Sequence, residues 1–351
     1  MQKIGAFKAR GAFHALTRLD KDTLQRRGVV THSSGNHAQA LALAASTFGA
    51  KAYVVMPGIS TPSKIAGTRR HGAEVIFSGS TSEEREKVVD EVRERTGAVL
   101  VPPYDHPDVI LGQGTLALEM EEQVERMLSG GYRGNGLERG GCSFAVGEGN
   151  GGTHEDGAAQ HNRKSKRLDA VIAPCGGGGM LSGVATALAG TGVRVFGAEP
   201  SFEGADDARR GLAQGRRIEK VKTLTIADGL RTPVGTIPWT VISDKDKVKD
   251  MFSVTESQIK SAMRLMLERA KLFIEPSAAV GVAVALYNED FRRMVQDEAG
   301  EEGWNVGIVL TGGNTTVDAI AKLFAPDETT GERQEGRLGV NGERVAENVA
   351  G

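Results

Sequence analysis

Hydrophobic positions in the first part of the chain alternate between two spacings. Ala9, Ala12, Phe13 and Leu16 recur at intervals of three and four residues, which is typical of one face of a helix. The run GVVTH (28–32) is instead β-branched and nearly continuous, as in a buried strand. The same alternation then repeats. It predicts helices over 9–18, 36–45, 60–72 and 82–97, and strands over 28–32, 51–57, 74–79 and 99–103.

The alternation is interrupted once and then resumes. Residues 130–157 contain 11 glycines and little apolar periodicity, so we expect 129–167 to be a flexible surface insertion. The charged, glycine-containing segment 326–351 is expected to be a disordered tail. The remaining pattern predicts strands over 168–174, 193–200 and the start of 305–314, and helices over 112–127, 180–190, 205–215, 256–272, 276–287 and 315–325.

This order of elements indicates an α/β fold with mostly parallel strands, in which ligands bind at the turns between strand ends and helices. A chain of 351 residues is long enough for two domains. The 43 basic and 45 acidic residues nearly cancel, so no nucleic-acid partner is expected. No apolar run reaches the length of a membrane span. The two cysteines, Cys142 and Cys175, are typical of a reducing compartment, and we expect a cytoplasmic protein.

The segment CGGGG (175–179) lies between a predicted strand and a predicted helix. Consecutive glycines let backbone N–H groups converge on an anion, and the N-terminus of a helix adds a favourable dipole. The alternative is a turn that is merely flexible. The spacing is neither GxGxxG nor that of a P-loop, because no GK[ST] follows. The segment therefore favours a small phosphorylated ligand over a dinucleotide.

Two further polar turns follow predicted strands. The turn SSGNH (33–37) offers hydroxyls, an amide and free N–H groups that suit a carboxylate, although such turns are often simple helix caps. The turn TGGN (311–314) again places a hydroxyl at a strand end. Together with Lys8, which lies among small apolar residues, these are the groups that a pyridoxal phosphate enzyme needs: an amine for the aldehyde, a cup for the phosphate and a partner for the pyridine nitrogen.

The sequence resembles the fold-type-II pyridoxal phosphate enzymes of the serine racemase and serine/threonine dehydratase group. The resemblance is carried by QKIGAFKARGA (2–12), SSGNHAQA (33–40), GQGT (112–115), CGGGGMLSG (175–183), GAEP (197–200), TIADGL (225–230), EPSAAVG (275–281) and TGGN (311–314), which follow the family's order. It implies a large and a small domain, each a three-layer structure around an open, twisted, mostly parallel sheet.

The resemblance also implies a role for individual residues. Lys8 would be the Schiff-base lysine and the base on one face of the cofactor. Asn36 would bond the cofactor's phenolic oxygen, Gly229 would lie along the ring and Thr311 would meet the pyridine nitrogen. The substrate carboxylate would lie at the turn formed by Ser33, Ser34, Asn36 and His37. The phosphate would be bound by the backbone of Gly176, Gly177, Gly178, Gly179 and Met180.

Two of these residues refine the expected chemistry. A neutral hydroxyl at Thr311 keeps the pyridine ring a weaker electron sink than an aspartate would, which favours loss of a β-leaving group. Ser34 would be the acid/base on the opposite cofactor face, which racemisation needs and elimination does not. The expected activity is thus that of a serine racemase, converting L-serine to D-serine, to pyruvate and ammonia, or to both. The alternative is a threonine/serine or 3-hydroxyaspartate dehydratase without racemisation.

Relatives in this group bind a divalent cation through a glutamate at the end of the GxEP strand and a following aspartate. Glu199 and Asp207, with the carbonyl of Ala205, would hold Mg²⁺ here, or Ca²⁺ or Mn²⁺, because these ions take oxygen ligands. The alternative is a solvated acidic loop.

Relatives of this kind also respond to ATP at a subunit interface. Lys3, Gln39 and Lys271 lie where that site would be, so ATP is a candidate effector and a homodimer is expected.

The resemblance places residues 1–28 and 107–325 in the large domain and 29–106 in the small domain. Family members carry a substantial segment before the catalytic lysine, whereas Lys8 here follows Met1 by seven residues. We therefore expect an N-terminally truncated chain, for which an inactive relative of the family is a further alternative.

Overall fold

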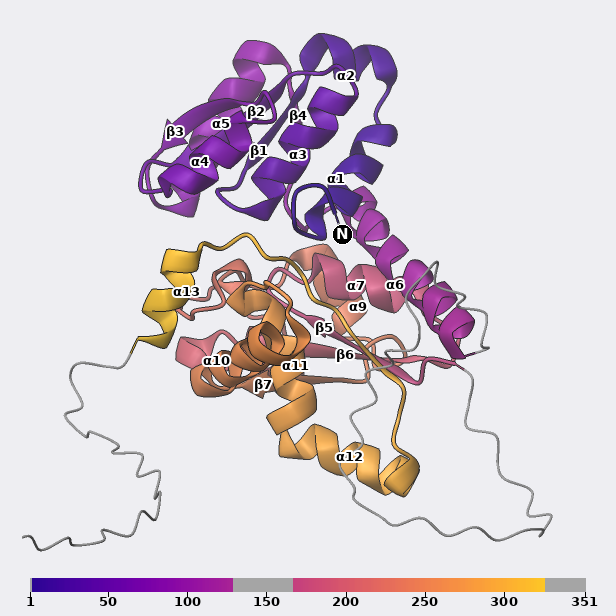
Figure 1. Cartoon of the computed structure of the whole chain (residues 1–351). Helices are drawn as coiled ribbons and strands as arrows, with labels where there is room; N and C mark the ends of the chain where they lie inside the picture. The colour runs from indigo at the N-terminus through magenta and orange to yellow at the C-terminus, as the bar shows by residue number, and fades with distance from the viewer. Residues whose placement is uncertain (1, 129–166, 326–351) are drawn as a thin grey trace, which may run out of the picture. The chain divides into compact units, whose positions relative to one another are not determined.

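The computed structural model of the chain describes residues 2–128 and 167–325 (Figure 1). The described residues up to Thr315 belong to one compact unit, and a second unit begins at Thr316. In the second unit the Thr316 hydroxyl accepts a hydrogen bond of 3.1 Å from the Ala319 amide and caps helix α13 (Val317–Phe324). The expected insertion, apart from Arg167, and the expected tail lie outside the described residues.

Four parallel strands form the first sheet, in the order β3-β2-β1-β4. The strands are β1 (Val29–His32), β2 (Ala52–Pro57), β3 (Glu74–Ser78) and β4 (Val99–Leu100). They are connected through the helices α3 (Asn36–Thr47), α4 (Pro62–Arg69) and α5 (Ser82–Thr96). Parallel strands need such crossovers, so the predicted alternation of helix and strand becomes one sheet.

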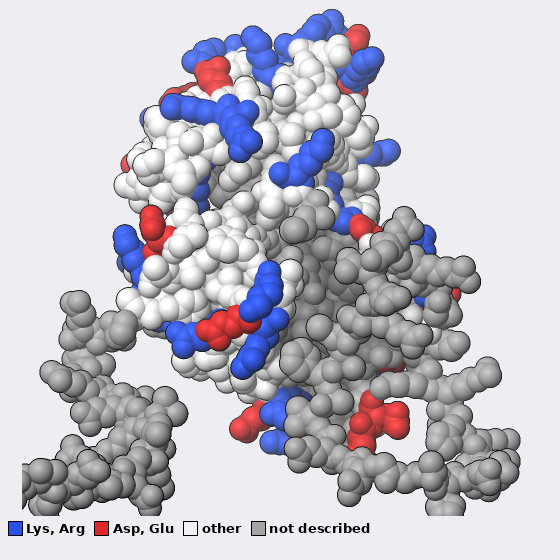
Figure 2. Space-filling view, in the orientation of Figure 1, with Lys and Arg blue, Asp and Glu red and all other residues white. Residues whose placement is uncertain are grey.

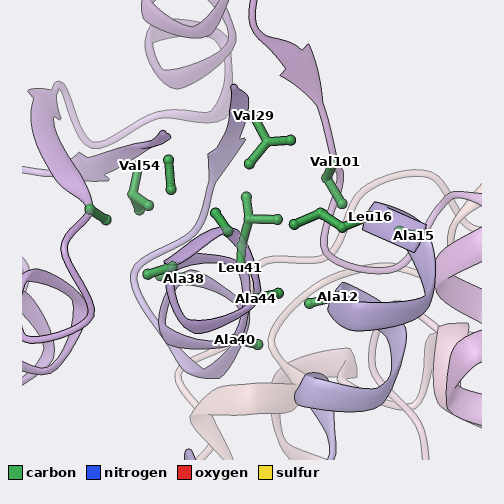
Figure 3. Close-up of a cluster of buried hydrophobic side chains, with 14 of the residues drawn as sticks. Ala12, Ala15, Leu16, Val29, Ala38, Ala40, Leu41, Ala44, Val54 and Val101 are labelled. Atoms are coloured by element: carbon green, nitrogen blue, oxygen red, sulfur yellow. The ribbon is translucent and has the colours of Figure 1, made fainter. Parts of the chain in front are cut away.

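Alternate side chains of β1 enter two different cores, one on each face of this sheet. Val29 packs with Leu41 in a cluster formed with α3 and with α1 (Lys8–Thr17) (Figure 3). Val30 packs with Val89 of α5 in a second cluster. Because both faces are covered, β1 is buried at Val29, Val30 and Thr31, as its β-branched sequence predicts.

The second sheet is also parallel, in the order β7-β6-β5-β8. Its strands are β5 (Ala170–Pro174), β6 (Arg194–Pro200), β7 (Asp250–Val254) and β8 (Val306–Ile308). One face packs in a cluster with residues of α6 (Pro107–Leu128), α7 (Gly179–Ala187) and α9 (Thr236–Ile242). On the other face lies α11 (Pro276–Tyr287), whose Gly281 is next to Ile172 and Ile308. The remaining α-helices of this part are α8 (Asp207–Gln214), α10 (Glu256–Leu265) and α12 (Glu289–Ala299).

The α/β architecture with two parallel sheets confirms the predicted fold class. Strand β7 and the helices α9, α12 and α2 (Lys21–Arg27) were not predicted. Helix α6 begins at Pro107 rather than at Gly112, and β4 ends before Pro102 and Pro103, which lack the N–H that a sheet ladder requires. No helix among the described residues combines the length and apolar character that crossing a membrane requires.

Helix α1 packs against both α3 and α6. Its contact with α6 is so close that a Cβ on Gly11 would lie 2.8 Å from the Val109 carbonyl oxygen. The segment that precedes β1 therefore touches elements of both proposed domains. The first sheet lies within 29–106 and the second within 107–325, but the assignment of 1–28 to the large domain stays a prediction.

The crossing of α6 and α7 also depends on two glycines. A Cβ on Gly114 would lie 2.7 Å from the Gly183 carbonyl oxygen, and one on Gly183 would lie 2.7 Å from the Gly114 amide nitrogen. Real Cβ atoms do not approach the backbone so closely, so any side chain would force the two helices apart.

We expect Gly114→Ala to lower the free energy of unfolding by about 1–3 kcal/mol, although alanine is the better helix former. Urea denaturation measures the effect. The matched control is Gly58→Ala, where the nearest atom to the added Cβ is the Ser78 carbonyl oxygen at 3.8 Å. We expect the control to change stability by less than about 0.5 kcal/mol. Equal losses in both variants would contradict this account of the helix crossing.

Candidate active site

The backbone just before Lys8 is held by the turn after β8. Ala6 forms an isolated bridge with Gly312, and the Phe7 amide donates a 3.0 Å hydrogen bond to the Thr311 carbonyl. The Lys8 Nζ donates a 2.6 Å hydrogen bond to the Pro103 carbonyl and lies 6.0 Å from the centre of the Tyr104 ring. Burial lowers the pKa of Lys8 to about 8, because the charged amine loses its hydration. A neutral, nucleophilic amine is therefore accessible near neutral pH.

The glycine segment forms a tight cup before α7. A Cβ on Gly176 would lie 2.8 Å from Leu230 Cα, and one on Gly179 would lie 2.9 Å from the Tyr104 carbonyl oxygen. Gly178 has a φ of 81°, in the left-handed region that favours glycine. The amides of Gly176, Gly177 and Gly178 hydrogen-bond to no described residue. Buried N–H groups need an acceptor, so this cup fits a phosphate.

A network of side-chain hydrogen bonds surrounds Asn36. Its Nδ2 donates to Glu275 Oε1 at 2.9 Å, and its Oδ1 accepts from Asn314 Nδ2 at 2.6 Å. The backbone amide of Asn314 donates to the other carboxylate oxygen of Glu275, Oε2, at 3.1 Å. Burial and the nearby charge of Asp228 raise the pKa of Glu275 to about 7. Glu275 and Asn314 belong to the motifs EPSAAVG and TGGN, but their contacts with Asn36 were not predicted.

Gly229 and Thr311 have different surroundings. The Gly229 amide donates a 3.0 Å hydrogen bond to the Ser277 hydroxyl, and the adjacent Leu230 lies against the glycine cup. Thr311 is 4% exposed, and its Oγ1 has no hydrogen-bond partner among the described residues. A buried hydroxyl without a partner is costly in a folded protein, which suits a ligand atom at this position.

The turn before α3 contributes its backbone and hydroxyls more than its histidine ring. The Ser33 Oγ accepts a 3.3 Å hydrogen bond from the Gly35 amide, and Ser34 is half-buried. The His37 ring is buried, and its Nε2 lies 3.0 Å from the Val101 carbonyl oxygen. Burial and the charge of Lys8 lower the pKa of His37 to about 3, so the ring stays neutral. Only the backbone of His37 could therefore contribute to the expected carboxylate site.

Tyr104 connects the lysine to the glycine cup and was missed from the sequence. A Cβ on Gly177 would overlap its ring, which also faces Lys8 Nζ. The residue follows β4 and Pro103, at the carboxyl end of a parallel strand. Ligands bind at such ends in α/β folds, so this position was a signal that could have found it.

The expected metal ligands form a separate acidic group. Glu199 and Asp207 are buried, as is Ala205. The Glu199 carboxylate accepts hydrogen bonds of 2.9 Å from the amides of Ala208 and Arg209, at the start of α8. Asp207 Oδ2 accepts from the Val234 amide at 3.0 Å, whereas Oδ1 has no partner among the described residues. Burial and mutual repulsion raise the pKa of Glu199, and burial raises that of Asp207 to about 6.

The residues expected at a nucleotide site lie in different surroundings. Lys3 lines a cavity of about 280 Å³ with Arg10 and Phe13. Gln39 lies against Gly67 of α4. Lys271 has a φ of 57°, and its Nζ donates to the Glu268 carbonyl at 2.5 Å. No hydrogen bond joins any two of the three, and the ATP site stays a prediction.

The described contacts thus connect most of the expected cofactor residues. Lys8 lies beside Thr311, Tyr104 joins Lys8 to the glycine cup, and the Asn36 network joins the first turn to Glu275. The free hydroxyl, the cup without side chains and the lysine of lowered pKa fit pyridoxal phosphate.

Comparison with known proteins agrees with this chemistry. Residues 1–312 match a family model described as "Pyridoxal-phosphate dependent enzyme". The chain is 37% identical over 321 residues to a serine racemase of Oryza sativa subsp. indica, covering 91% of this chain and 80% of that protein. It is 34% identical over 330 residues to an L-threo-3-hydroxyaspartate ammonia-lyase of Saccharomyces cerevisiae, covering 93% of this chain and 84% of that protein. The structure of maize serine racemase is similar with a TM-score of 0.74 and 36% identity, covering 91% of this chain and 83% of that one.

The pKa of about 8 predicts how Lys8 reacts with a carbonyl. Only the neutral amine attacks, so the rate of pyridoxal phosphate incorporation into apoprotein should rise about tenfold per pH unit below pH 8 and then level off. Borohydride trapping followed by peptide mass spectrometry measures the rate at Lys8. Nα-acetyl-lysine, measured in parallel, should keep rising to about pH 10. If the rate at Lys8 follows the same pH curve as that of Nα-acetyl-lysine, the lowered pKa of Lys8 is wrong.

Proposed function

The chain belongs to the family of pyridoxal-phosphate dependent enzymes, and from this premise we propose that it acts on a small β-hydroxy amino acid. The proposed reactions are conversion of L-serine to D-serine and to pyruvate and ammonia. The similarity to serine racemases supports this substrate class. The observation that carries the proposal is the buried Lys8 amine, whose pKa is lowered and which lies beside Pro103 and Tyr104.

Each residue has a separate task in this proposal. Bound pyridoxal phosphate supplies an electron sink that stabilises negative charge at the substrate's α-carbon. The backbone of Gly176 to Met180 would hold its phosphate, Asn36 would bond its phenolic oxygen, Thr311 would meet its pyridine nitrogen and Gly229 would lie along its ring. The hydroxyls and backbone of the Ser33–His37 turn hold the substrate carboxylate. These contacts orient the α-hydrogen toward Lys8.

Proton transfer by Lys8 and Ser34 decides the product. The neutral Lys8 amine takes the α-proton on one face of the substrate. If Ser34 delivers a proton to the opposite face, the product is the other enantiomer. If the β-hydroxyl leaves first, taking a proton to form water, hydrolysis consumes one water and releases pyruvate and ammonia. The two outcomes therefore differ in the use of Ser34.

A second candidate is elimination without racemisation, on serine, threonine or 3-hydroxyaspartate. The yeast relative is an L-threo-3-hydroxyaspartate ammonia-lyase, which favours keeping this candidate. It needs Lys8 but not a proton donor at Ser34.

One experiment tests both candidates. The purified protein with pyridoxal phosphate should show a visible absorbance band that Lys8→Ala abolishes and that Lys21→Ala, at an exposed lysine, retains. Ser34→Ala should lower D-serine formation from L-serine at least about tenfold while pyruvate formation continues. The matched control is Ser46→Ala, at an exposed serine. Absence of the band in the wild type would refute the proposal that the protein is a pyridoxal phosphate enzyme. Unchanged D-serine formation in Ser34→Ala would refute the proposed role of Ser34 in racemisation.

We further propose that Glu199, Asp207 and the Ala205 carbonyl hold Mg²⁺. Two buried carboxylates with raised pKa values and one unpaired oxygen favour a cation at this position. In the described part of the chain, no group of three or more His, Cys, Asp or Glu side chains could hold a metal ion, so the site needs the backbone carbonyl. A nucleotide effector and a homodimer are proposed on the family resemblance alone.

Added Mg²⁺ should raise the melting temperature of the wild-type protein by several degrees, because a ligand that binds only the folded state stabilises it. Asp207→Asn should abolish this increase, and Asp246→Asn, at an exposed position, should retain it. Differential scanning fluorimetry with and without EDTA measures the shift. An equal Mg²⁺ response in Asp207→Asn would exclude the site.

A further inference from the structure

The loop after β4 contacts both the reacting lysine and the glycine cup. The Pro103 carbonyl accepts the 2.6 Å hydrogen bond from Lys8 Nζ. The next residue lies against the cup, because a Cβ on Gly179 would be 2.9 Å from the Tyr104 carbonyl oxygen. The residue after that, Asp105, hydrogen-bonds to the start of α9. Three consecutive residues of this loop thus have three different partners around the cofactor site.

Asp105 supplies a cap that α9 lacks. The helix begins at Thr236 after Gly235, which has no side chain to bond the first free amides. The two carboxylate oxygens of Asp105 instead accept hydrogen bonds of 2.9 Å from the amides of Thr236 and Ile237. Many charged side chains that Figure 2 shows project from the surface among uncharged ones. Asp105 is half-buried, and its negative charge suits the positive end of the helix.

Gly235 connects this cap to the glycine cup. A Cβ on Gly235 would lie 2.7 Å from Asp105 Cγ, so the carboxylate packs directly against this residue. The Gly235 amide donates a 3.1 Å hydrogen bond to the Gly177 carbonyl. The peptide between Gly177 and Gly178 is trans, so its N–H points opposite to its carbonyl. The Gly178 amide therefore points away from Gly235, and it hydrogen-bonds to no described residue.

Side chains of α9 lie against the same part of the cup. A Cβ on Gly178 would be 2.8 Å from both Pro238 Cβ and Ile242 Cδ1, and these two residues are buried in α9. Close-packed groups move together. A shift of α9 would thus displace the backbone that is proposed to bind the phosphate.

We propose that Asp105 is a positioning residue for the cofactor phosphate, because it holds α9 and Gly235 where they direct the Gly178 amide into the cup. This inference rests on the cofactor of the proposed function and adds a residue to the same site. Charge and position make opposite predictions for this carboxylate. Its charge repels a phosphate, so charge alone predicts tighter phosphate binding when Asp105 is removed. Its position at the start of α9 predicts weaker binding.

Pyridoxal phosphate and pyridoxal differ only in the phosphate, and both have the aldehyde that reacts with Lys8. The ratio of their dissociation constants, pyridoxal over pyridoxal phosphate, therefore measures the contribution of the phosphate. Equilibrium dialysis of the full chain freed of cofactor gives both values. We expect Asp105→Ala to lower the ratio about 10- to 100-fold, because a hydrogen bond to a charged group is lost. Asp105→Asn, which keeps one acceptor oxygen, should lose less. An unchanged or raised ratio in Asp105→Ala would overturn the proposal.

The matched control is Asp20→Ala. Asp20 caps α2 through the Thr23 amide at 2.8 Å, and α2 has seven residues, as α9 has. The control variant loses a helix cap away from the cup, so it should lower the melting temperature but keep the wild-type ratio. If Asp20→Ala lowers the ratio as much as Asp105→Ala does, general destabilisation explains the loss and the proposal fails.

A second variant reaches the same contact from the other side. Gly235 has a φ of −66°, which alanine adopts readily, so the cost of Gly235→Ala comes from the contact of its Cβ with the Asp105 carboxylate. The substitution should lower the ratio in the wild type but not further in Asp105→Ala, where the carboxylate is absent. Additive losses would contradict the proposal. If Asp105→Ala does not fold, Asp105→Asn takes its place in both comparisons.

These binding measurements also separate the inference from the proposed function, because they require no turnover. If no amino acid is converted but the ratio depends on Asp105, the proposed reaction fails and the positioning role stands. If serine is converted and the ratio does not change in Asp105→Ala, the proposed reaction stands and the positioning role fails.

Discussion

The structure depends on keeping one amine away from water. Transferring a charged lysine into a protein interior costs several kcal/mol, and the protein lowers that cost by letting the amine lose its proton more easily. Lys8 therefore has a pKa of about 8, with a backbone carbonyl as its hydrogen-bond acceptor. The surrounding backbone is pinned to the turn after β8 through Ala6 and Phe7. These contacts hold the start of α1 beside residues more than 300 positions later in the chain.

Glycine makes the close approach of these segments possible. The same absence of a side chain lets α6 cross α7 and lets the segment before α7 lie against Tyr104 and Leu230. In the segment before α7, three backbone amides hydrogen-bond to no described residue. The absence of side chains there thus allows both the close packing and the binding of an anion. The Asn36 network fixes the orientation of the Asn36 side-chain amide, because Glu275 bonds its Nδ2 and Asn314 bonds its Oδ1.

Most elements were predictable because their periodicity reflects burial on one or both faces. The strands β1, β2, β5 and β6 are buried at nearly every position, and most of their residues are apolar or β-branched. Helix α2 is short, with Leu24 as its one buried residue, and α12 buries Phe291 alone within a mostly polar and charged sequence. Strand β7 (DMFSV) is brief and mixed in composition. Local pattern is too weak a signal for such elements, which tertiary packing stabilises.

The candidate site was likewise predictable only in part. The sequence by itself determined the parallel α/β class, the glycine cup, the polar strand-end turns and the lysine, because each is a local pattern with a local physical reason. It also carried the family resemblance, since eight motifs follow one order. Only the tertiary structure decided that Tyr104 joins the lysine to the cup, that Glu275 and Asn314 hold Asn36, and that Asp105 caps α9. Such pairings connect residues far apart in the chain, and no local spacing encodes a distance in space.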